Sequence, residues 1–317
     1  MRPLADGSLD PQGPAARTIA DLWWIMLGLG AVVFVVFAVA LALGLFRRRP
    51  HSGDGSSNQA SSASGRWFAV VGVVLPAVVV VVVLAATVVA MRAVPNSPSG
   101  SPGALKIEII GHQWWWEVRY SEEGFTTANE LHIPVGRPVT LRLSATDVIH
   151  SFWVPRLAGK IDMLPDGTNT MVLEADAPGE HSSQCAEFCG IGHANMALTV
   201  VAEPEQEFLS WVAARQRPTE EPSGETEQRG LDVFMASECA DCHTIRGASE
   251  ADAADGPDLT HFADRPDLGA TFLPNTRANL ADWIRDPHEI KPGVKMPATE
   301  LSEEELDALL DYLEGLE

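Results

Sequence analysis

Two long apolar runs near the N-terminus constrain this chain more than any other feature. Residues 21–46 and 67–91 are almost uncharged, and each is long enough to cross a bilayer, which takes about 20 apolar residues in a helix. A cleaved signal peptide is the alternative for the first run, but the run exceeds the roughly 7–15 apolar residues of such a peptide, and its arginines follow it. We therefore expect an N-terminal tail with little fixed structure (1–19) and then a two-helix transmembrane hairpin (20–92).

Arginines between the two runs predict the orientation of the hairpin. Arg47–Arg49 end the first run, Arg66 precedes the second, and a Gly/Ser-rich connector (52–65) lies between them. Because cytoplasmic loops carry the excess of Lys and Arg, this loop is assigned to the cytoplasmic side of a bacterial plasma membrane. Both termini, and both soluble parts of the chain, are then expected on the outer side.

The rest of the chain is polar and acidic. The formal net charge of −21 argues against a nucleic-acid partner, because phosphate binding needs Lys and Arg. A Pro/Ser/Gly linker (94–103) leads to a first soluble domain (104–203), in which short alternating stretches broken by turn residues predict an all-β sandwich or barrel. The expected strands are Lys106–Ile110, Trp114–Tyr120, Arg137–Leu143, Asn169–Leu173 and Ala197–Ala202.

The C-terminal third of the chain favours helices. A short amphipathic helix (Gln206–Arg215) is expected inside a polar linker (204–228), and we expect this linker to act as a flexible tether. In the last domain (229–317), leucines on one face of residues 301–316 follow a Ser–Glu capping-box pattern, which predicts a C-terminal helix. Both soluble domains are acidic, so electrostatic attraction is a poor explanation for their docking.

The four cysteines occur as two close pairs, Cys185/Cys189 and Cys239/Cys242. In an exported domain paired cysteines usually form disulfides. A bridge across so short a loop would restrain little of the unfolded chain, and a histidine follows each pair closely. This arrangement favours metal and haem chemistry.

The segment Cys185-Ala-Glu-Phe-Cys189-Gly-Ile-Gly-His193-Ala-Asn-Met196 concentrates soft and borderline metal ligands. Two thiolates, an imidazole and a thioether select copper or zinc over hard cations. A single cysteine would indicate a mononuclear blue-copper site, whereas two thiolates can bridge two copper ions, each of which still needs an imidazole. His193 supplies one imidazole and His150 is the candidate for the other. A structural zinc site is the alternative.

Cys239-Ala-Asp-Cys242-His243 is the attachment motif of a c-type haem, with two thioether links and a proximal imidazole. An accidental match or half of a zinc site is the alternative. Met296, in a Lys-Met-Pro sequence before the expected final helix, is the candidate distal ligand. Ligation by His and Met raises the haem potential, which suits electron transfer. Two histidines, His261 and His288, are the other candidates for the sixth ligand.

Residues 20–203 resemble subunit II of cytochrome c oxidases. The resemblance is carried by Gly111-His-Gln-Trp114-Trp-Trp116-Glu, by Asp147-Val-Ile-His150-Ser-Phe and by the run from Cys185 to Met196. Residues 229–317 resemble a class I cytochrome c. Together they imply a multi-domain membrane protein of the caa type, in which a two-helix hairpin precedes an all-β cupredoxin-like copper domain and an all-α cytochrome c domain.

Carried over residue by residue, the resemblance implies a dinuclear copper centre. Glu187 would give one copper its backbone carbonyl, and its side chain would reach a magnesium ion shared with subunit I. Trp114 matches the aromatic position through which electrons enter, whereas Trp115 is expected to be a packing residue. The side-chain copper ligands would be His150, Cys185, Cys189, His193 and Met196. Three further histidines, His112, His132 and His181, are expected to be structural.

The resemblance predicts the electron-transfer subunit of an aerobic respiratory terminal oxidase. Electrons would come from a cytochrome c, or from a membrane-bound cytochrome or quinol–cytochrome reductase. They would pass to haem c, to the dinuclear copper and then to the haem of subunit I, where oxygen is reduced to water. Subunit I and other membrane subunits are the implied partners, and this chain alone should not reduce oxygen. Quinol-oxidising relatives keep the fold but lack the copper ligands found here.

Two alternatives of other classes are a copper subunit of a nitric oxide reductase from the same superfamily and a membrane-anchored electron carrier without a catalytic partner. The sequence also departs from the family in one respect. Relatives often carry a glutamate early in the second transmembrane helix, on a path for protons, whereas residues 65–70 contain no acid. The departure puts this proton route in doubt.

Overall fold

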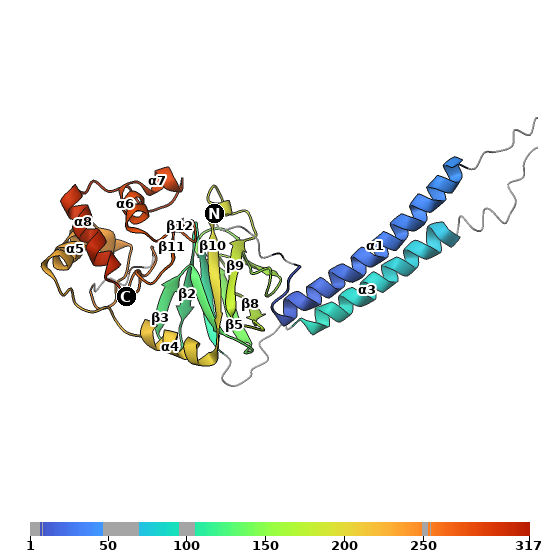
Figure 1. Cartoon of the computed structure of the whole chain (residues 1–317), viewed down its shortest axis with the longest axis horizontal. Coiled ribbons are helices and arrows are strands. Elements are labelled where there is room, and N and C mark those ends of the chain that lie inside the picture. The colour runs from blue at the N-terminus through green and yellow to red at the C-terminus, as the bar shows by residue number, and fades with distance from the viewer. Residues whose placement is uncertain (1–6, 8, 47–69, 95–104, 249–252, 254) are drawn as a thin grey trace, which may run out of the picture. The chain divides into compact units, whose positions relative to one another are not determined.

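The computed structural model (Figure 1) describes residues 7, 9–46, 70–94, 105–248, 253 and 255–317. The chain divides into two compact units, one of them Arg17–Val94 and the other Met1–Ala16 with Pro95–Glu317. Several segments discussed above lie outside the described residues. These are Arg47–Arg49, the connector 52–65, Arg66, the acid-free stretch 65–69, and the linker 94–103 apart from Val94.

Two helices provide the expected membrane spans. Helix α1 covers Pro14–Phe46, and α3 covers Leu75–Ala93 after a π-helical turn, η1 (Val70–Val74). Both are long and apolar enough to cross a membrane, and none of their most apolar stretch is buried inside the protein. A helix that is apolar yet unburied suits a lipid environment.

The prediction of a loosely ordered N-terminal tail is wrong for its second half. Helix α1 begins at Pro14 rather than near residue 21. The proline ring holds the backbone near helical geometry and lacks the N–H that a first turn leaves unpaired. The backbone N–H of Gln12 donates to the carbonyl of Arg156 at 2.7 Å, and that of Ala16 donates to Leu157 at 3.2 Å. These hydrogen bonds order a segment whose composition alone indicated none.

The middle of the chain forms a β-sandwich, which we call the β domain (105–203). One sheet has the strand order β3-β2-β1-β5-β8 and the other β4-β10-β9-β6-β7. The pairs β1–β5 and β10–β4 are parallel, and the remaining pairs are antiparallel. The strands are β1 (Lys106–His112), β2 (Trp115–Tyr120), β3 (Phe125–Ala128), β4 (Glu130–Pro134), β5 (Val139–Ala145), β6 (His150–Trp153), β7 (Lys160–Met163), β8 (Asn169–Leu173), β9 (Gly179–Cys185) and β10 (Ala197–Glu203).

Alternating side chains form the core between the two sheets. On β2, Trp116, Val118 and Tyr120 are fully buried, because successive side chains of a strand point to opposite faces. The hydroxyl of Tyr120 donates to the carbonyl of His132 and accepts from its N–H, both at 2.8 Å. All five strands expected from the sequence are present. The other five are short or rich in polar residues, so their apolar alternation is weak.

The segment between the two soluble domains is not a flexible tether, which corrects the prediction for residues 204–228. Helix α4 (Glu205–Arg215) occupies nearly half of it and buries Phe208 and Val212. Beyond this helix, the imidazole Nε2 of His261 donates to the carbonyl of Arg217 at 3.0 Å. Helix α4 confirms the amphipathic helix expected at Gln206–Arg215, but its buried face and the hydrogen bond beyond it hold in place a segment that was expected to act as a flexible tether.

The last part of the chain forms an α-helical domain, which we call the C-terminal domain (225–317). Gly230 lies where α5 crosses α8, and a Cβ at this position would clash with the carbonyl of Ala308. Ser302 and Glu305 form the expected capping box at the start of α8. The elements are α5 (Glu225–Ala236), η3 (Cys239–Asp241), the short ladder of β11 (Asp267–Leu268) with β12 (Leu273–Pro274), α6 (Arg277–Arg285), α7 (Pro287–Ile290) and α8 (Glu303–Glu314).

Candidate metal centres

Neighbouring strands of one sheet bring the expected copper ligands together. Strand β9 ends at Cys185, and β6 begins at His150 and pairs with β9 through Phe152 and Cys185. The loop that leaves β9 carries Cys189, and the short helix η2 (His193–Asn195) returns the chain to β10. A histidine 35 positions before the first cysteine therefore lies at the same end of the sheet.

The candidate ligand atoms of this loop and of His150 on β6 form a compact group. We call it the Cys/His cluster (His150, Cys185, Glu187, Cys189, His193 and Met196). The two sulfur atoms of Cys185 and Cys189 are 3.7 Å apart, too far for a disulfide bond of about 2.05 Å. The Nδ1 atom of His150 lies 3.9 Å from the sulfur of Cys185. On the other side, the sulfur of Cys189 lies 3.6 Å from Nδ1 of His193 and 3.9 Å from Sδ of Met196.

The electrostatics of the two thiols fit a cation. Hydrogen bonding to Cys189 lowers the pKa of Cys185 to about 3, against the effect of burial, and His150 adds to the shift. The hydrogen bond to Cys185 raises the pKa of Cys189, and burial and the negative charge of Cys185 add to the shift, because a second thiolate at this distance would be repelled. A metal ion between the sulfurs removes this penalty and holds both as thiolates. The residues present therefore fit a thiolate-bridged metal site.

His150 is held in the orientation that a ligand requires. Its Nε2 donates to Oδ1 of Asp147 at 2.9 Å, so the other ring nitrogen, Nδ1, faces the cysteine sulfur as an acceptor. A second hydrogen-bond partner of this kind fixes the tautomer of metal-binding histidines. Gly111 makes room for the ring, because a Cβ at this position would lie 2.9 Å from Cδ2 of His150.

Trp114 lies directly against the loop of the Cys/His cluster and is only 7% exposed. Its indole Nε1 donates to the carbonyl of Cys189 at 3.0 Å, and Nε2 of Gln113 donates to the same carbonyl at 2.7 Å. A Cβ on Gly192 would clash with the indole ring. The glycine spacing of the loop thus allows the aromatic ring to approach the cluster closely.

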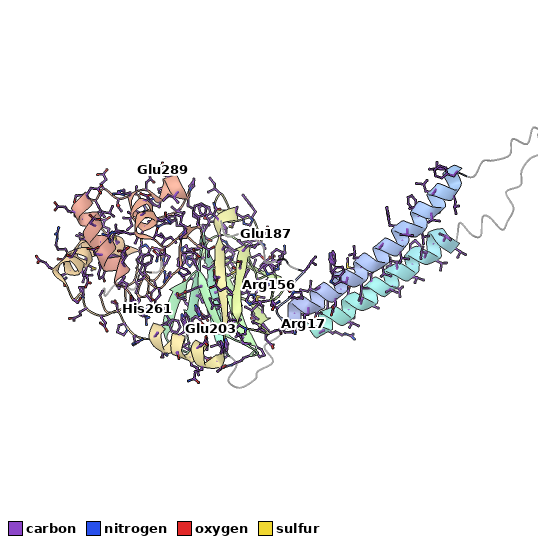
Figure 2. All side chains as sticks on the ribbon, viewed as in Figure 1. Arg17, Arg156, Glu187, Glu203, His261 and Glu289 are labelled. Carbon is purple, nitrogen blue, oxygen red and sulfur yellow. The ribbon has the colours of Figure 1, made fainter. Side chains whose placement is uncertain are left out.

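The backbone and the side chain of Glu187 point to different surroundings. The carbonyl oxygen of Glu187 lies 3.2 Å from the sulfur of Cys185, where it could serve as a metal ligand. The side chain is exposed (Figure 2), so its carboxylate is accessible from outside the β domain.

The three histidines expected to be structural are buried in the β domain and lie outside the Cys/His cluster. His112 lies 3.0 Å from a carboxylate oxygen of Glu117 and stacks on Trp115 with ring centroids 4.2 Å apart. His132 stacks on Trp211 at 3.9 Å. His181 is buried on β9. The packing partner of Trp115 agrees with its expected role.

In the C-terminal domain, His243 is set up as a haem ligand. Its Nδ1 donates to the carbonyl of Pro257 at 2.8 Å, which leaves Nε2 free to bind iron. Burial lowers the pKa of His243, so the ring is neutral, as metal binding requires. A Cβ on Gly256 would lie 2.7 Å from Cε1 of His243, which requires glycine at this position.

The other expected haem residues lie along the core of the same domain. Cys239 and Met296 both pack against the buried apolar cluster that α5, α6 and α8 share. Cys239 and Cys242 are free thiols, so both sulfurs can form thioether links. His261 (Figure 2) is bound to the carbonyl of Arg217, and His288 is exposed. This arrangement fits a haem between His243 and Met296 better than a haem with His261 or His288 as its sixth ligand.

Comparison with known proteins identifies the family to which this chain belongs. The chain is 38% identical over 315 residues to the cytochrome c oxidase subunit 2 of Alkalihalophilus pseudofirmus, and the match covers 98% of this chain and 90% of the relative. The chain belongs to the cytochrome c oxidase subunit 2 family. Two family models match this subunit 2 chain, "Cytochrome C oxidase subunit II, periplasmic domain" over residues 123–203 and "Cytochrome c" over residues 227–317.

Two further matches come from the same protein class. The quinol oxidase subunit 2 of Bacillus spizizenii is 30% identical over 216 residues, which are 66% of either protein. The solved periplasmic domain of cytochrome oxidase subunit II from Bradyrhizobium japonicum is 30% identical, with a TM-score of 0.35, and covers 37% of this chain and 97% of that one.

Family membership confirms the fold class and the oxidase assignment. The β domain of this oxidase subunit implies copper, and its cytochrome c domain implies haem c. The two apolar helices and the match to a periplasmic domain fit a membrane-anchored protein with an extracytoplasmic part.

Sequence reasoning missed several residues that shape the two sites. Asp147 and Gln113 lie inside the quoted sequence motifs beside His150 and Trp114, so their position in those motifs was an available signal. Lys291 contacts Trp114 from the other domain, and no sequence pattern marks it.

Proposed function

We propose that this oxidase subunit carries electrons from a c-type haem in its C-terminal domain to a dinuclear copper centre in its β domain, and from there to the haem of subunit I. Cys239 and Cys242 would hold the haem covalently, and His243 and Met296 would supply its two protein ligands. His150, Cys185, Cys189, His193 and Met196 hold the two copper ions with their side chains, and Glu187 does so with its carbonyl oxygen.

One observation carries this proposal: two thiols 3.7 Å apart lie between one imidazole on each side. Two thiolates with one imidazole on each side would offer a thiolate and imidazole donor set to each of two copper ions. A tetrahedral zinc site would use the same four groups on one ion, but the thioether of Met196 and the carbonyl of Glu187 would then have no role. The presence of six donors therefore favours two copper ions over one zinc ion.

Trp114 offers the contact between the two redox domains. Its indole Nε1 donates to the carbonyl of Cys189, and a Cβ on Gly293 of the C-terminal domain would lie 3.0 Å from the indole ring. The ring thus touches the Cys/His cluster on one edge and the haem-bearing domain on another. We assign to it the step between haem and copper.

The remaining functional assignments follow from the same proposal. Both soluble domains face the outside of a bacterial plasma membrane, and an external cytochrome or a membrane-bound cytochrome reductase supplies the electrons. The exposed carboxylate of Glu187 shares a magnesium ion with subunit I. No feature of the described residues favours a nitric oxide reductase or a carrier without a catalytic partner.

Replacing Cys189 with Ser in the full oxidase tests the copper assignment. One remaining thiolate cannot bridge two copper ions in the same way, so the mixed-valence EPR signal should disappear while the haem-c absorption remains. A Ser183→Ala variant, which alters a buried residue of β9 without removing a sulfur, is the matched control. Retention of the full copper signal in the Cys189 variant would refute the ligand assignment.

A further inference from the structure

Lys291 is a buried lysine at the contact between the two redox domains. It follows α7 in the C-terminal domain and is only 2% exposed. Its Nζ donates to the backbone carbonyl of Trp114 in the β domain at 2.9 Å and to that of Gly269 in its own domain at 2.8 Å. A lysine is rarely buried to this extent because removing its charge from water is costly.

The environment of this lysine explains how the burial is tolerated. Burial lowers the pKa of Lys291 to about 7, and Cys189 in its thiolate form would partly oppose the shift. The two carbonyl acceptors replace water as hydrogen-bond partners of the amine. They come from different domains, so moving the domains apart would break one of the two bonds.

The neighbouring residues show that this contact is close on both sides. Gly293 has a φ of +88°, and a Cβ there would lie 2.8 Å from Cγ2 of Ile191 and 3.0 Å from the indole of Trp114. The N–H of Ala197 donates to the carbonyl of Ala270 at 3.4 Å. The C-terminal domain therefore rests on the loop of the Cys/His cluster through backbone as well as side chains.

We propose that Lys291 is a positioning residue that fixes the haem-bearing domain against Trp114 and so sets the geometry of electron transfer within the chain. The inference rests on the proposed function, in which Trp114 lies between haem and copper. In the step concerned, the ferrous haem loses one electron and the copper centre gains it, with no bond made or broken and no further reactant. Lys291 takes no part in the chemistry; it limits the distances that the two domains sample.

The physical reason is that electron transfer weakens steeply with distance. A linker alone would hold the domains near each other at a high effective concentration, but in many orientations. A hydrogen bond from a buried lysine to the backbone of Trp114 selects one orientation. Because it joins the backbone rather than the ring, it leaves the indole free to keep its bond to Cys189.

The test is a Lys291→Met variant of the complete oxidase. Methionine keeps the length and apolar stem of the side chain but removes the donor. The matched control is Lys106→Met. Lys106 lies on β1 in an exposed ion pair with Glu122, so this variant removes the same charge from a site outside the domain contact. After rapid reduction of haem c by an external donor, haem oxidation and copper reduction are followed optically in each protein.

We expect haem-to-copper transfer in Lys291→Met to be slower by about tenfold or more, since a misplacement of about 1 Å can cost up to roughly a hundredfold in rate. The transfer should also become sensitive to solvent viscosity, because domain motion then limits it. The optical and EPR signatures of both sites, and the rate at which the external donor reduces the haem, should stay unchanged. A merely stabilising role would leave the transfer rate independent of viscosity.

The outcomes separate this inference from the proposed function. If haem and copper exchange electrons in the wild-type protein and Lys291→Met does so equally fast, Lys291 has no positioning role. If the wild-type protein itself shows no such exchange, the proposed function fails instead. Should Lys291→Met not assemble, Gly293→Ala displaces the same contact with Lys291 retained. Slowed, viscosity-dependent transfer in that variant supports the positioning contact, and an unchanged rate overturns it.

Discussion

The indole Nε1 of Trp114 donates a hydrogen bond to the backbone carbonyl of Cys189 at 3.0 Å. The backbone carbonyl of the same tryptophan accepts the hydrogen bond from Lys291. Trp114 is therefore fixed to the β domain by its side chain and to the C-terminal domain by its backbone. One residue thus contacts both the Cys/His cluster and the C-terminal domain.

Replacing Trp114 with Phe should slow haem-to-copper transfer. Phenylalanine keeps an aromatic ring but cannot donate to Cys189, so the ring loses its fixed position, and a misplacement of this kind can cost roughly tenfold to a hundredfold in rate. Flash-induced electron transfer in the intact oxidase measures the effect. Trp115→Phe is the control, because Trp115 stacks on His112 and not on the cluster loop. Equal rates in the two variants would make Trp114 a packing residue.

Asp147 is expected to strengthen copper binding through His150. Its Oδ1 accepts from Nε2 of His150 at 2.9 Å, while its other oxygen accepts from the N–H of Gln113 at 2.8 Å. Loss of such a supporting carboxylate usually costs about 10–100-fold in metal affinity. Asp147→Asn should therefore lose copper to a chelator at a lower chelator concentration than wild type. The exposed Asp162 of β7 provides the control variant, Asp162→Asn, and an identical loss of copper from both would contradict this role.

How far the sequence predicts the sites depends on whether their residues are close in the chain. Cys185, Cys189, His193 and Met196 are spaced within one loop, so their chemistry is readable without a fold. His150 was predictable because it lies in a motif that carries the family resemblance. The same holds for the attachment residues of haem c. The roles of all these residues remain predictions, whereas the proximity of His150, Cys185, Cys189, His193 and Met196 in the β domain is a structural observation.

The contacts between domains could not be predicted in this way. Lys291 and Trp114 are 177 positions apart, and nothing in the local sequence of either indicates the other. The linker was expected to be flexible because it is polar, yet α4 packs on the β domain, and Arg215 pairs with Asp264 of the C-terminal domain at 2.5 Å. Overall acidity argues against attraction between the domains, yet a local pair of opposite charge lies at their contact, Lys295 with Asp147 at 3.7 Å.

Glu130 is expected to make the stability of the protein depend on pH in the acidic range. Burial by itself would raise the pKa of Glu130, but the hydrogen bond with His132 and the charges of Arg265 and Arg215 lower it to about 2. A carboxyl group with a lowered pKa in the folded state stabilises the fold above its ordinary pKa of 4.5, and this contribution is lost as the pH falls toward 2. The melting temperature should therefore decrease over this window.

The comparison of Glu130→Gln with Glu122→Gln isolates this effect. Gln has no charge to lose, so the Glu130 variant should be less stable than wild type at neutral pH and should show a weaker dependence between pH 4.5 and 2. Glu122 is an exposed partner of Lys106, and its substitution should leave the curve close to that of wild type. Thermal unfolding followed by tryptophan fluorescence gives both curves. Parallel curves for wild type and Glu130→Gln would exclude Glu130 as the source.

Met296 is expected to be the distal haem ligand, and its replacement by Ala should separate haem attachment from haem ligation. Covalent attachment requires only the two cysteines, so the haem should remain bound through Cys239 and Cys242. Without the thioether, the sulfur-to-iron absorption band should vanish and the midpoint potential should fall, because a methionine ligand raises it. Met235 on α5 is 47% exposed, and Met235→Ala is the matched control. A lower potential also weakens the driving force for reduction of the haem by its external donor, so the Met296 variant should accumulate oxidised haem under steady turnover. Persistence of the sulfur-to-iron band in Met296→Ala, with its loss in another variant, would move the ligand elsewhere in the C-terminal domain.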